Sequence, residues 1–217
     1  MDQSTFVTRV AGRLNMDSND PAYSSLTGYV DEGLHWLETA APEGWPWMRR
    51  TLTLTTTIGV QEYSFATLGA LVTPSVAVSR INDVTVLRDS TVYMAMDLIS
   101  PETADNYYGA TATRCPESWY AEGQSLWVYP SPDAAYTMKV RVVYTETDLG
   151  AGASTPVLPV VFHGAVIDAA MLIAYQRLQD TARIEEQRRL LQDWIERMRR
   201  YGNEYAAAPR IMVRDPL

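Results

Sequence analysis

The sequence predicts an α+β fold in which N- and C-terminal helices form a helical bundle and an antiparallel β-rich domain is inserted between them. Two observations predict it. Apolar residues recur at helical spacing near both ends of the 217-residue chain, and in the middle their spacing falls to two. We therefore expect N-terminal helices over 1–50, a β-rich insert over 51–149, long C-terminal helices over 150–206 and an extended tail over 207–217.

Two helices are expected in residues 1–50, before an aromatic connector at residues 45–50. The first runs from about Ser4 to Asn15. The second starts with Asp20 as N-cap and Pro21 at its first helical position, and it stops at residues 42–44, Pro-Glu-Gly. Their apolar stripes are Phe6, Val7, Val10 and Leu14, followed by Leu26, Val30, Gly33, Leu34 and Leu37.

The β-rich insert is predicted from residues that alternate in polarity and favour strands. A short helix interrupts it, beginning at Ser100-Pro101-Glu102 and ending at Gly109. In the last strand Met138, Val140, Val142 and Tyr144 face one way, so that Lys139 and Arg141 face the other. The expected strands cover residues 51–55, 61–65, 76–87, 92–98, 117–121, 125–129 and 137–145.

Helix is predicted again from Pro159 to about Ala206, after a flexible linker at residues 150–156. The part up to Leu178 is apolar on most sides, as in a helix buried among others. A break at residues 179–181, Gln-Asp-Thr, is expected to divide this segment into two helices. Beyond it a single seam faces one helix or one neighbouring subunit, because apolar residues recur every seven positions: Ile184, Leu191, Met198 and Tyr205, with Trp194 and Tyr201.

The composition narrows the possible functions. The net charge of −8 argues against a protein that wraps DNA through phosphate contacts. Residues 177–217 hold nine arginines against seven acids, whereas residues 1–176 hold nine basic residues against nineteen acids. The single cysteine, Cys115, fits a protein made in a reducing cytoplasm. No apolar run is long enough to suggest a membrane span.

No residue constellation predicts catalysis, a metal or a cofactor. His35 and His163 have no second histidine or cysteine at ligand spacing, and His163 is expected to be a hydrogen-bonded core residue. Cys115 has no sequence signature of a catalytic nucleophile. Residues 17–20, Asp-Ser-Asn-Asp, begin like a calcium loop but continue with Pro21, so they are better interpreted as a helix cap.

Four aromatic residues cluster on one predicted hairpin: Trp119, Tyr120, Trp127 and Tyr129. Such side chains can stack on sugars or bases. They can also form cross-strand pairs in a core or a subunit interface, which we favour because the chain is acidic.

The order of motifs in the second half resembles tailed-bacteriophage head-to-tail adaptors, a group that includes podophage tail tubular A-like proteins. The motifs are Pro-x-Ser-Trp-Tyr from Pro116, Leu-Trp-Val-Tyr-Pro-x-Pro-Asp from Leu126, Val143-Tyr144, and Leu158-Pro159 before an alanine-rich helix. The N-terminal helices and the Trp45-Pro46-Trp47 connector are also similar.

This resemblance implies a structural protein of the virion neck and no enzyme, cofactor or membrane association. It implies a ring, typically of twelve copies, between the portal protein and a tail or nozzle/head-closure protein. DNA would pass through the lumen without specific binding, and an acidic lumen that repels phosphate would let it slide. The alternative is a carbohydrate-binding β-module that uses Trp119 and Trp127 as its stacking platform.

Two sets of residues are expected to make the contacts of an adaptor. The heptad seam of the last helix, flanked by arginines and carboxylates, predicts a subunit interface of Ile184, Arg188, Leu191, Trp194, Met198 and Tyr201. The tail is poorly suited to water and well suited to lie extended along a partner, and the resemblance points to the portal. Its predicted portal-binding residues are Arg210, Ile211, Met212, Val213 and Arg214.

Overall fold

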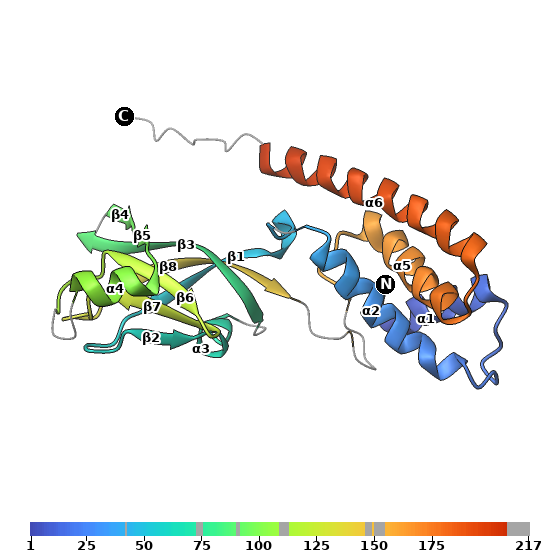
Figure 1. The fold of residues 1–217 in the computed structure, drawn as a ribbon, viewed down its shortest axis with the longest axis horizontal. Helices are drawn as coiled ribbons and strands as arrows, with labels where there is room; N and C mark the ends of the chain where they lie inside the picture. Colours follow the sequence, from blue (N-terminus) through green and yellow to red (C-terminus); the bar gives the residue numbers. More distant parts are fainter. Residues whose placement is uncertain are drawn as a thin grey trace, which may run out of the picture. The chain divides into compact units, whose positions relative to one another are not determined.

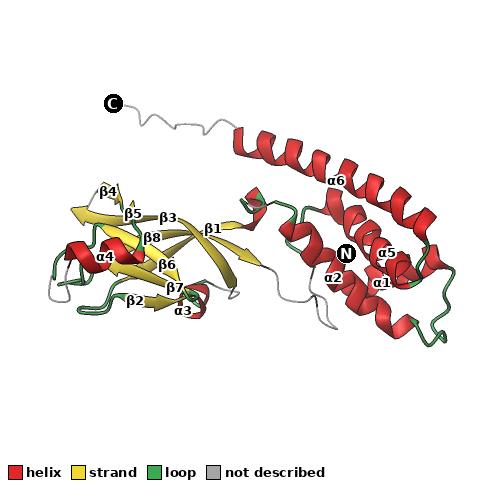
Figure 2. Ribbon diagram, viewed as in Figure 1, coloured by secondary structure: helices red, strands yellow, loops and turns green. Residues whose placement is uncertain are grey.

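The computed structural model divides into two compact units (Figure 1). The helical unit combines Met1–Trp47 with Asp148–Leu217, and the β unit is Met48–Thr147. The structure describes residues 1–41, 43–72, 76–89, 92–108, 113–145, 149 and 155–207. The architecture is α+β, with helices toward both ends of the chain and strands between them, as the sequence predicts (Figure 2).

In its described residues the helical unit contains four α-helices. They are α1 (Gln3–Leu14), α2 (Leu26–Thr39), α5 (His163–Arg177) and α6 (Thr181–Ala207). Short 3₁₀ turns precede or follow them at η1 (Tyr23–Ser25), η2 (Pro46–Met48) and η3 (Val160–Phe162). Helix α5 is buried on nearly all sides because it packs against α1, α2 and α6.

Helix α1 has a cap at each end. The Asp2 carboxylate accepts a hydrogen bond from the Thr5 backbone N–H at 2.9 Å, which satisfies a donor of the first turn. Asn15 takes a left-handed conformation with φ of 54°, and its N–H bonds back to Ala11 and Gly12. These caps place the helix within a residue of its predicted bounds at both ends.

Helix α2 begins later than predicted. Asp20 caps a turn, because its side chain accepts from the Ala22 N–H at 2.8 Å and its carbonyl accepts from Tyr23. The chain then makes the 3₁₀ turn η1, and the α-helix starts only at Leu26. The predicted stripe is correct, since Leu26, Val30, Gly33, Leu34 and Leu37 are all buried.

The predicted break between the last two helices is confirmed. Gln179 adopts a positive φ of 57°, and the Asp180 carboxylate accepts from the Arg183 N–H at 3.2 Å. Asp180 therefore caps α6, which runs for 27 residues against the 15 of α5. At a rise of about 1.5 Å per residue, α6 extends well beyond the length of α5, as Figure 1 shows.

The described part of the β unit forms two four-stranded sheets. The first, sheet A, has the order β1-β8-β3-β4, and the second, sheet B, has the order β2-β7-β6-β5. All pairs are antiparallel except β5 with β6. The strands are β1 (Arg49–Thr55), β2 (Glu62–Ser64), β3 (Ala77–Asp89), β4 (Val92–Ala95), β5 (Asp97–Leu98), β6 (Ser118–Glu122), β7 (Ser125–Tyr129) and β8 (Thr137–Thr145).

One predicted strand is in fact two. Residues 92–98 were expected to form a single strand, but β4 pairs in sheet A and β5 in sheet B. Met96 lies between them: its N–H bonds to Val84 of sheet A, and the next N–H, that of Asp97, bonds to the Glu117 carbonyl beside β6. The buried Met96 side chain thus marks the point where the chain crosses between sheets.

Two short helices accompany the sheets. Helix α4 (Pro101–Tyr108) starts where predicted, with the Ser100 hydroxyl accepting from the Thr103 N–H at 3.2 Å. Helix α3 (Phe65–Gly69) was not expected; the Ser64 hydroxyl accepts from the Thr67 N–H at 3.2 Å and ends β2. The predicted stop at Gly109 lies outside the described residues.

The core of the β unit lies between the two sheets. Strand β8 contributes Met138, Val140 and Val142, each fully buried, as its alternation predicts. They meet side chains of both sheets, namely Leu52, Leu54, Ile81, Val84 and Val86 from sheet A and Tyr63, Trp119, Leu126 and Val128 from sheet B. The other face of each sheet therefore points away from this shared core.

His163 is a satisfied core residue, as the sequence predicts. Its ring is buried, with 1% of the residue exposed, and lies 5.4 Å from the Phe6 ring. The Met1 amino group bonds to Nδ1 at 3.1 Å. Because an ammonium can only donate, Nδ1 accepts, and Nε2–H donates to the Leu158 carbonyl at 3.0 Å. Burial, and then the N-terminal charge, lower the pKa of His163.

Two glycines of α2 provide a matched test of helix packing. A Cβ on Gly33 would lie 2.9 Å from the Ala170 backbone nitrogen of α5, whereas a Cβ on Gly28 would meet nothing within 4 Å. We expect Gly33→Ala to lower the free energy of unfolding by about 1–3 kcal/mol through overpacking. Gly28→Ala should raise it by up to about 1 kcal/mol through helix propensity. Urea denaturation of both variants checks this, and equal effects would contradict the close approach of α2 to α5.

The buried imidazole predicts a pH dependence of stability. The folded protein keeps His163 neutral where the unfolded chain binds a proton, so stability rises with pH and is lost as the pH falls below about 6.5, the pKa of an unfolded histidine. We expect His163→Gln to flatten this loss by up to about 1.4 kcal/mol per pH unit. Unfolding curves at several pH values check it, with His35→Gln as the control. A wild-type slope that survives in His163→Gln would show that other groups cause it.

Candidate assembly surfaces

The seam predicted as a subunit interface packs largely inside the helical unit. Leu191 and Met198 of α6 are fully buried, and Ile184 and Trp194 are partly buried. Of the six predicted residues, Arg188 and Tyr201 are exposed. The seam thus meets α5 of the same chain, so a contact with another subunit has to use the exposed positions of α6.

A buried carboxylate joins three helices beneath this seam. Asp168 of α5 is 7% exposed, and it bonds to the Arg13 guanidinium of α1. Its second oxygen accepts from the Trp194 indole N–H of α6 at 2.7 Å. A Cβ on Gly164, one turn earlier in α5, would lie 3.1 Å from the Trp194 ring, so the indole fits closely against α5. Asp168 therefore fixes how α6 sits on the bundle.

Aromatic rings continue the packing toward the C-terminal turns of α6. Tyr201 meets Phe162 edge-on with ring centres 5.2 Å apart, and Phe162 stacks on Trp47 at 5.9 Å. Trp47 in turn stacks on Trp45 at 5.1 Å. The predicted aromatic connector is thus a packing surface for α6, and Tyr201 leaves one edge of this stack in solvent, at 36% exposure.

The remaining surface of α6 carries alternating arginines and carboxylates. Arg188 pairs with Glu185 at 2.8 Å, and Arg200 with Glu196 at 3.7 Å, both on the exposed side of the helix. Such surface pairs contribute little to stability, roughly 0–1 kcal/mol each. The same charges are therefore available to exchange partners with another subunit at small cost.

The two tryptophans proposed as a sugar platform do not form one. Trp119 lies in the core between the sheets and is 4% exposed. Trp127 pairs in register with Tyr120 and stacks on it at 6.0 Å, whereas Trp119 pairs with Val128. Neighbouring residues of a strand point to opposite faces, so Trp119 and Trp127 cannot bind the same ring. The carbohydrate alternative is wrong for this pair.

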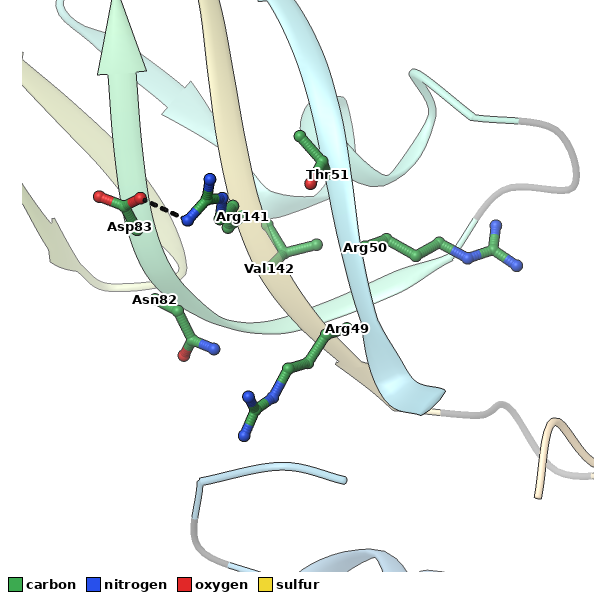
Figure 3. A pocket seen from close by; sticks show the side chains of 7 residues that line it. All are labelled: Arg49, Arg50, Thr51, Asn82, Asp83, Arg141 and Val142. Carbon is green, nitrogen blue, oxygen red and sulfur yellow. Dashed lines mark ion pairs between the residues drawn. The ribbon is translucent and has the colours of Figure 1, made fainter. Parts of the chain in front are cut away.

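A shallow hollow of about 250 Å³ lies at the start of β1, in a region that the sequence suggested was only a connector (Figure 3). Arg49 and Arg50 leave the strand in opposite directions. Arg141 of β8 lies near Arg49 and pairs with Asp83 of β3 at 3.3 Å. Arg50 lies over the Tyr144 ring at 5.0 Å. Only the pairing of β1 with β8 brings these arginines together, so no local sequence signal could find the site.

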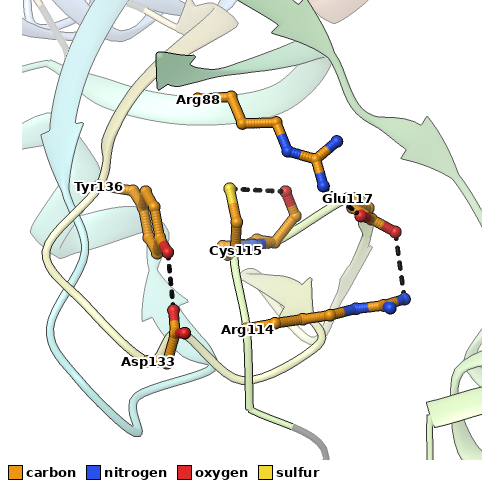
Figure 4. Close-up of polar contacts among 7 residues, drawn as sticks. Arg88, Arg114, Cys115, Glu117, Asp133 and Tyr136 are labelled. Atoms are coloured by element: carbon orange, nitrogen blue, oxygen red, sulfur yellow. Dashed lines mark hydrogen bonds and ion pairs between the residues drawn. The ribbon is translucent and has the colours of Figure 1, made fainter. Parts of the chain in front are cut away.

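A second polar cluster organises the loop before β6 (Figure 4). Glu117 pairs with Arg88 at 2.9 Å and with Arg114 at 3.1 Å. The Tyr136 hydroxyl donates to Asp133 at 2.7 Å, and this bond, with burial, raises the pKa of Tyr136 to about 12. The ion pairs hold the loop before β6 in place, and the hydrogen bond holds the turn between β7 and β8.

The cysteine and the histidines are separated between the units. Cys115 belongs to the β unit and both histidines to the helical unit, so neither unit contains a thiol–imidazole pair. Among the described residues, no group of three or more histidine, cysteine, aspartate or glutamate side chains could hold a metal ion. The predicted portal-binding residues, Arg210 to Arg214, lie outside the described part of the chain.

No helix of the described segments has the length and apolar character needed to cross a membrane. A search of curated proteins finds no match to the chain. A family model described as the SU10 adaptor protein matches residues 1–214, which is nearly the whole sequence. This is a family of structural phage adaptors, which is not a class of enzymes. The chain belongs to the SU10 adaptor protein family of tailed-phage head-to-tail adaptors.

Proposed function

We propose that this adaptor forms a closed ring in the virion neck, between the portal protein and a tail or nozzle/head-closure protein. The observation that carries the proposal is the family match over residues 1–214. A ring typically of twelve copies follows from the resemblance to podophage tail tubular A-like adaptors. Its subunits would meet in part through the exposed side of α6, including Arg188 and Tyr201.

The physical character of α6 supports a subunit contact. This helix spans 27 residues, yet its buried seam occupies only one side. Leu190 and Tyr201 remain 38% and 36% exposed beside the arginine–carboxylate pairs. Apolar groups surrounded by exchangeable charges are typical of an interface between protein subunits.

DNA would pass through the lumen of such a ring without specific binding. The net charge of −8 supports this role, because a surface that repels phosphate does not retain the passing duplex. The tail would extend from α6 to the portal, with Ile211 and Val213 in apolar pockets and Arg210 and Arg214 on carboxylates.

Ring formation is tested by mass measurement. We expect the full chain, mixed with its portal protein, to give cyclic particles in negative stain and a multiple of the subunit mass in native mass spectrometry. Arg188→Glu should weaken assembly at least about fivefold through like-charge contact, while Arg9→Glu on α1 should leave it unchanged. Portal mixtures that never show a cyclic density would contradict the proposal.

Portal attachment is tested by shortening the chain. Deleting residues 207–217 should abolish binding to the portal while leaving the melting temperature nearly unchanged, because no described core residue is lost. The double variant Ile211→Asp/Val213→Asp should act like the deletion, since carboxylates cannot enter apolar pockets. Unchanged portal affinity in the shortened protein would rule the tail out as the anchor.

A further inference from the structure

The outer face of sheet A is basic. Cross-strand partners point to the same side of a sheet, and the pairing Arg49↔Val143↔Arg80 places both arginines on the face opposite the core. Arg141 and Lys139 follow on β8, where every second residue faces outward. The Lys139 ammonium lies over the Tyr93 ring of β4, 3.8 Å from its centre. We call these four residues, Arg49, Arg80, Lys139 and Arg141, the basic face.

The Asp83 carboxylate is bound on the basic face. Asp83 lies opposite Arg141 in the register and pairs with it at 3.3 Å. Arg80 donates from Nε to the Asn82 side chain at 3.0 Å. Arg49, Arg80 and Arg141 are nonetheless exposed, and Arg49 and Arg141 border the 250 Å³ hollow. The face thus accepts a carboxylate, and its three arginines also present their side chains to solvent.

The outer face of sheet B is acidic. The register Glu62↔Trp127↔Tyr120 places Glu62 on the outer side, and Glu122 follows two residues after Tyr120. Asp97 pairs with Ser118 on the same side. Asp105 of α4 lies near enough that its charge, with that of Glu122, adds to burial in raising the pKa of Tyr120. We call these four exposed residues, Glu62, Asp97, Asp105 and Glu122, the acidic face.

The two faces are on opposite sides of the β unit. Sheets A and B share the core between them, so their outer faces point away from each other. The described strand positions on the outer side of sheet B include no arginine or lysine. Two copies that met through the same face would place like charges together, whereas a head-to-tail contact pairs opposite charges at every step. Head-to-tail contacts are the kind that close into rings.

We propose that the basic face of one copy binds the acidic face of the next copy, so that the β units form a second, electrostatic belt of contacts around the ring. This inference rests on the proposed ring and adds the surface by which its β units pair. The occupant is a second copy because this chain, with its net charge of −8, carries the matching carboxylates on the opposite side of the same unit.

Charge reversal on each face, followed by mixing, tests the pairing. Arg49→Glu/Arg141→Glu leaves both faces with more carboxylates than basic groups, and Glu62→Arg/Asp97→Arg/Glu122→Arg leaves both faces with more basic groups than carboxylates. Alone, each variant should need at least about tenfold more protein to assemble with portal than wild type. An equimolar mixture should restore assembly, because the two variants alternate around the ring with opposite charges at every contact. That rescue also shows that both variants fold.

Controls separate this inference from the proposed ring and from DNA binding. Arg9→Glu/Arg177→Glu, which changes the net charge as much as the basic-face variant, should assemble like wild type.

Wild-type assembly should weaken between about 0.05 and 0.5 M salt, because exposed pairs are screened. Suppose that wild type forms rings. If the reversed variants then assemble equally well, or if mixing does not rescue them, the pairing of the two faces is wrong and the proposed ring stands. If wild type forms no ring, the ring and the pairing of the faces are both wrong. If the basic-face variant assembles normally but loses low-salt retention on duplex DNA, the basic face meets DNA instead.

Discussion

The β unit depends on the side-chain alternation of β8. This strand pairs with β1 on one side and β3 on the other, and its fully buried Met138, Val140 and Val142 form the middle of the shared core. Once these three residues face inward, Lys139 and Arg141 must face outward. A shift of one residue in the register would bury both cations and expose the core. The charged outer face of sheet A is therefore a consequence of how the core is packed.

The helical unit has a different organising contact. Asp168 brings Arg13 of α1 and Trp194 of α6 to one carboxylate within the bundle, and α2 approaches α5 so closely at Gly33 that a methyl group does not fit. These constraints hold α6 by its seam and leave its arginine–carboxylate side to solvent. This division suits the proposed subunit contact, in which α6 is firmly attached to its own chain and its charged side meets another copy.

Sequence patterns predicted the elements whose signals are local. The period of α1, the stripe of α2, the break at Gln179–Thr181 and the inward side of β8 all follow from residues close together in the chain. The errors arose where a distant partner decides the outcome. Residues 92–98 divide between two sheets at Met96, and Trp119 and Trp127 lie on opposite faces because of where β6 and β7 pair. The arginines near Arg49 were hidden for the same reason. The sequence left open whether the seam of α6 faces a helix or a neighbouring subunit, and the structure buries Leu191 and Met198 within the helical unit.

A cryo-electron microscopy reconstruction of the portal–adaptor assembly tests the central claim most directly. We expect a closed ring of this chain beneath the portal, with α6 at a subunit boundary and the outer side of sheet A turned toward sheet B of the neighbouring copy. Density showing single, unconnected copies on the portal, or none at the portal, would contradict the claim that this protein is a ring-forming head-to-tail adaptor.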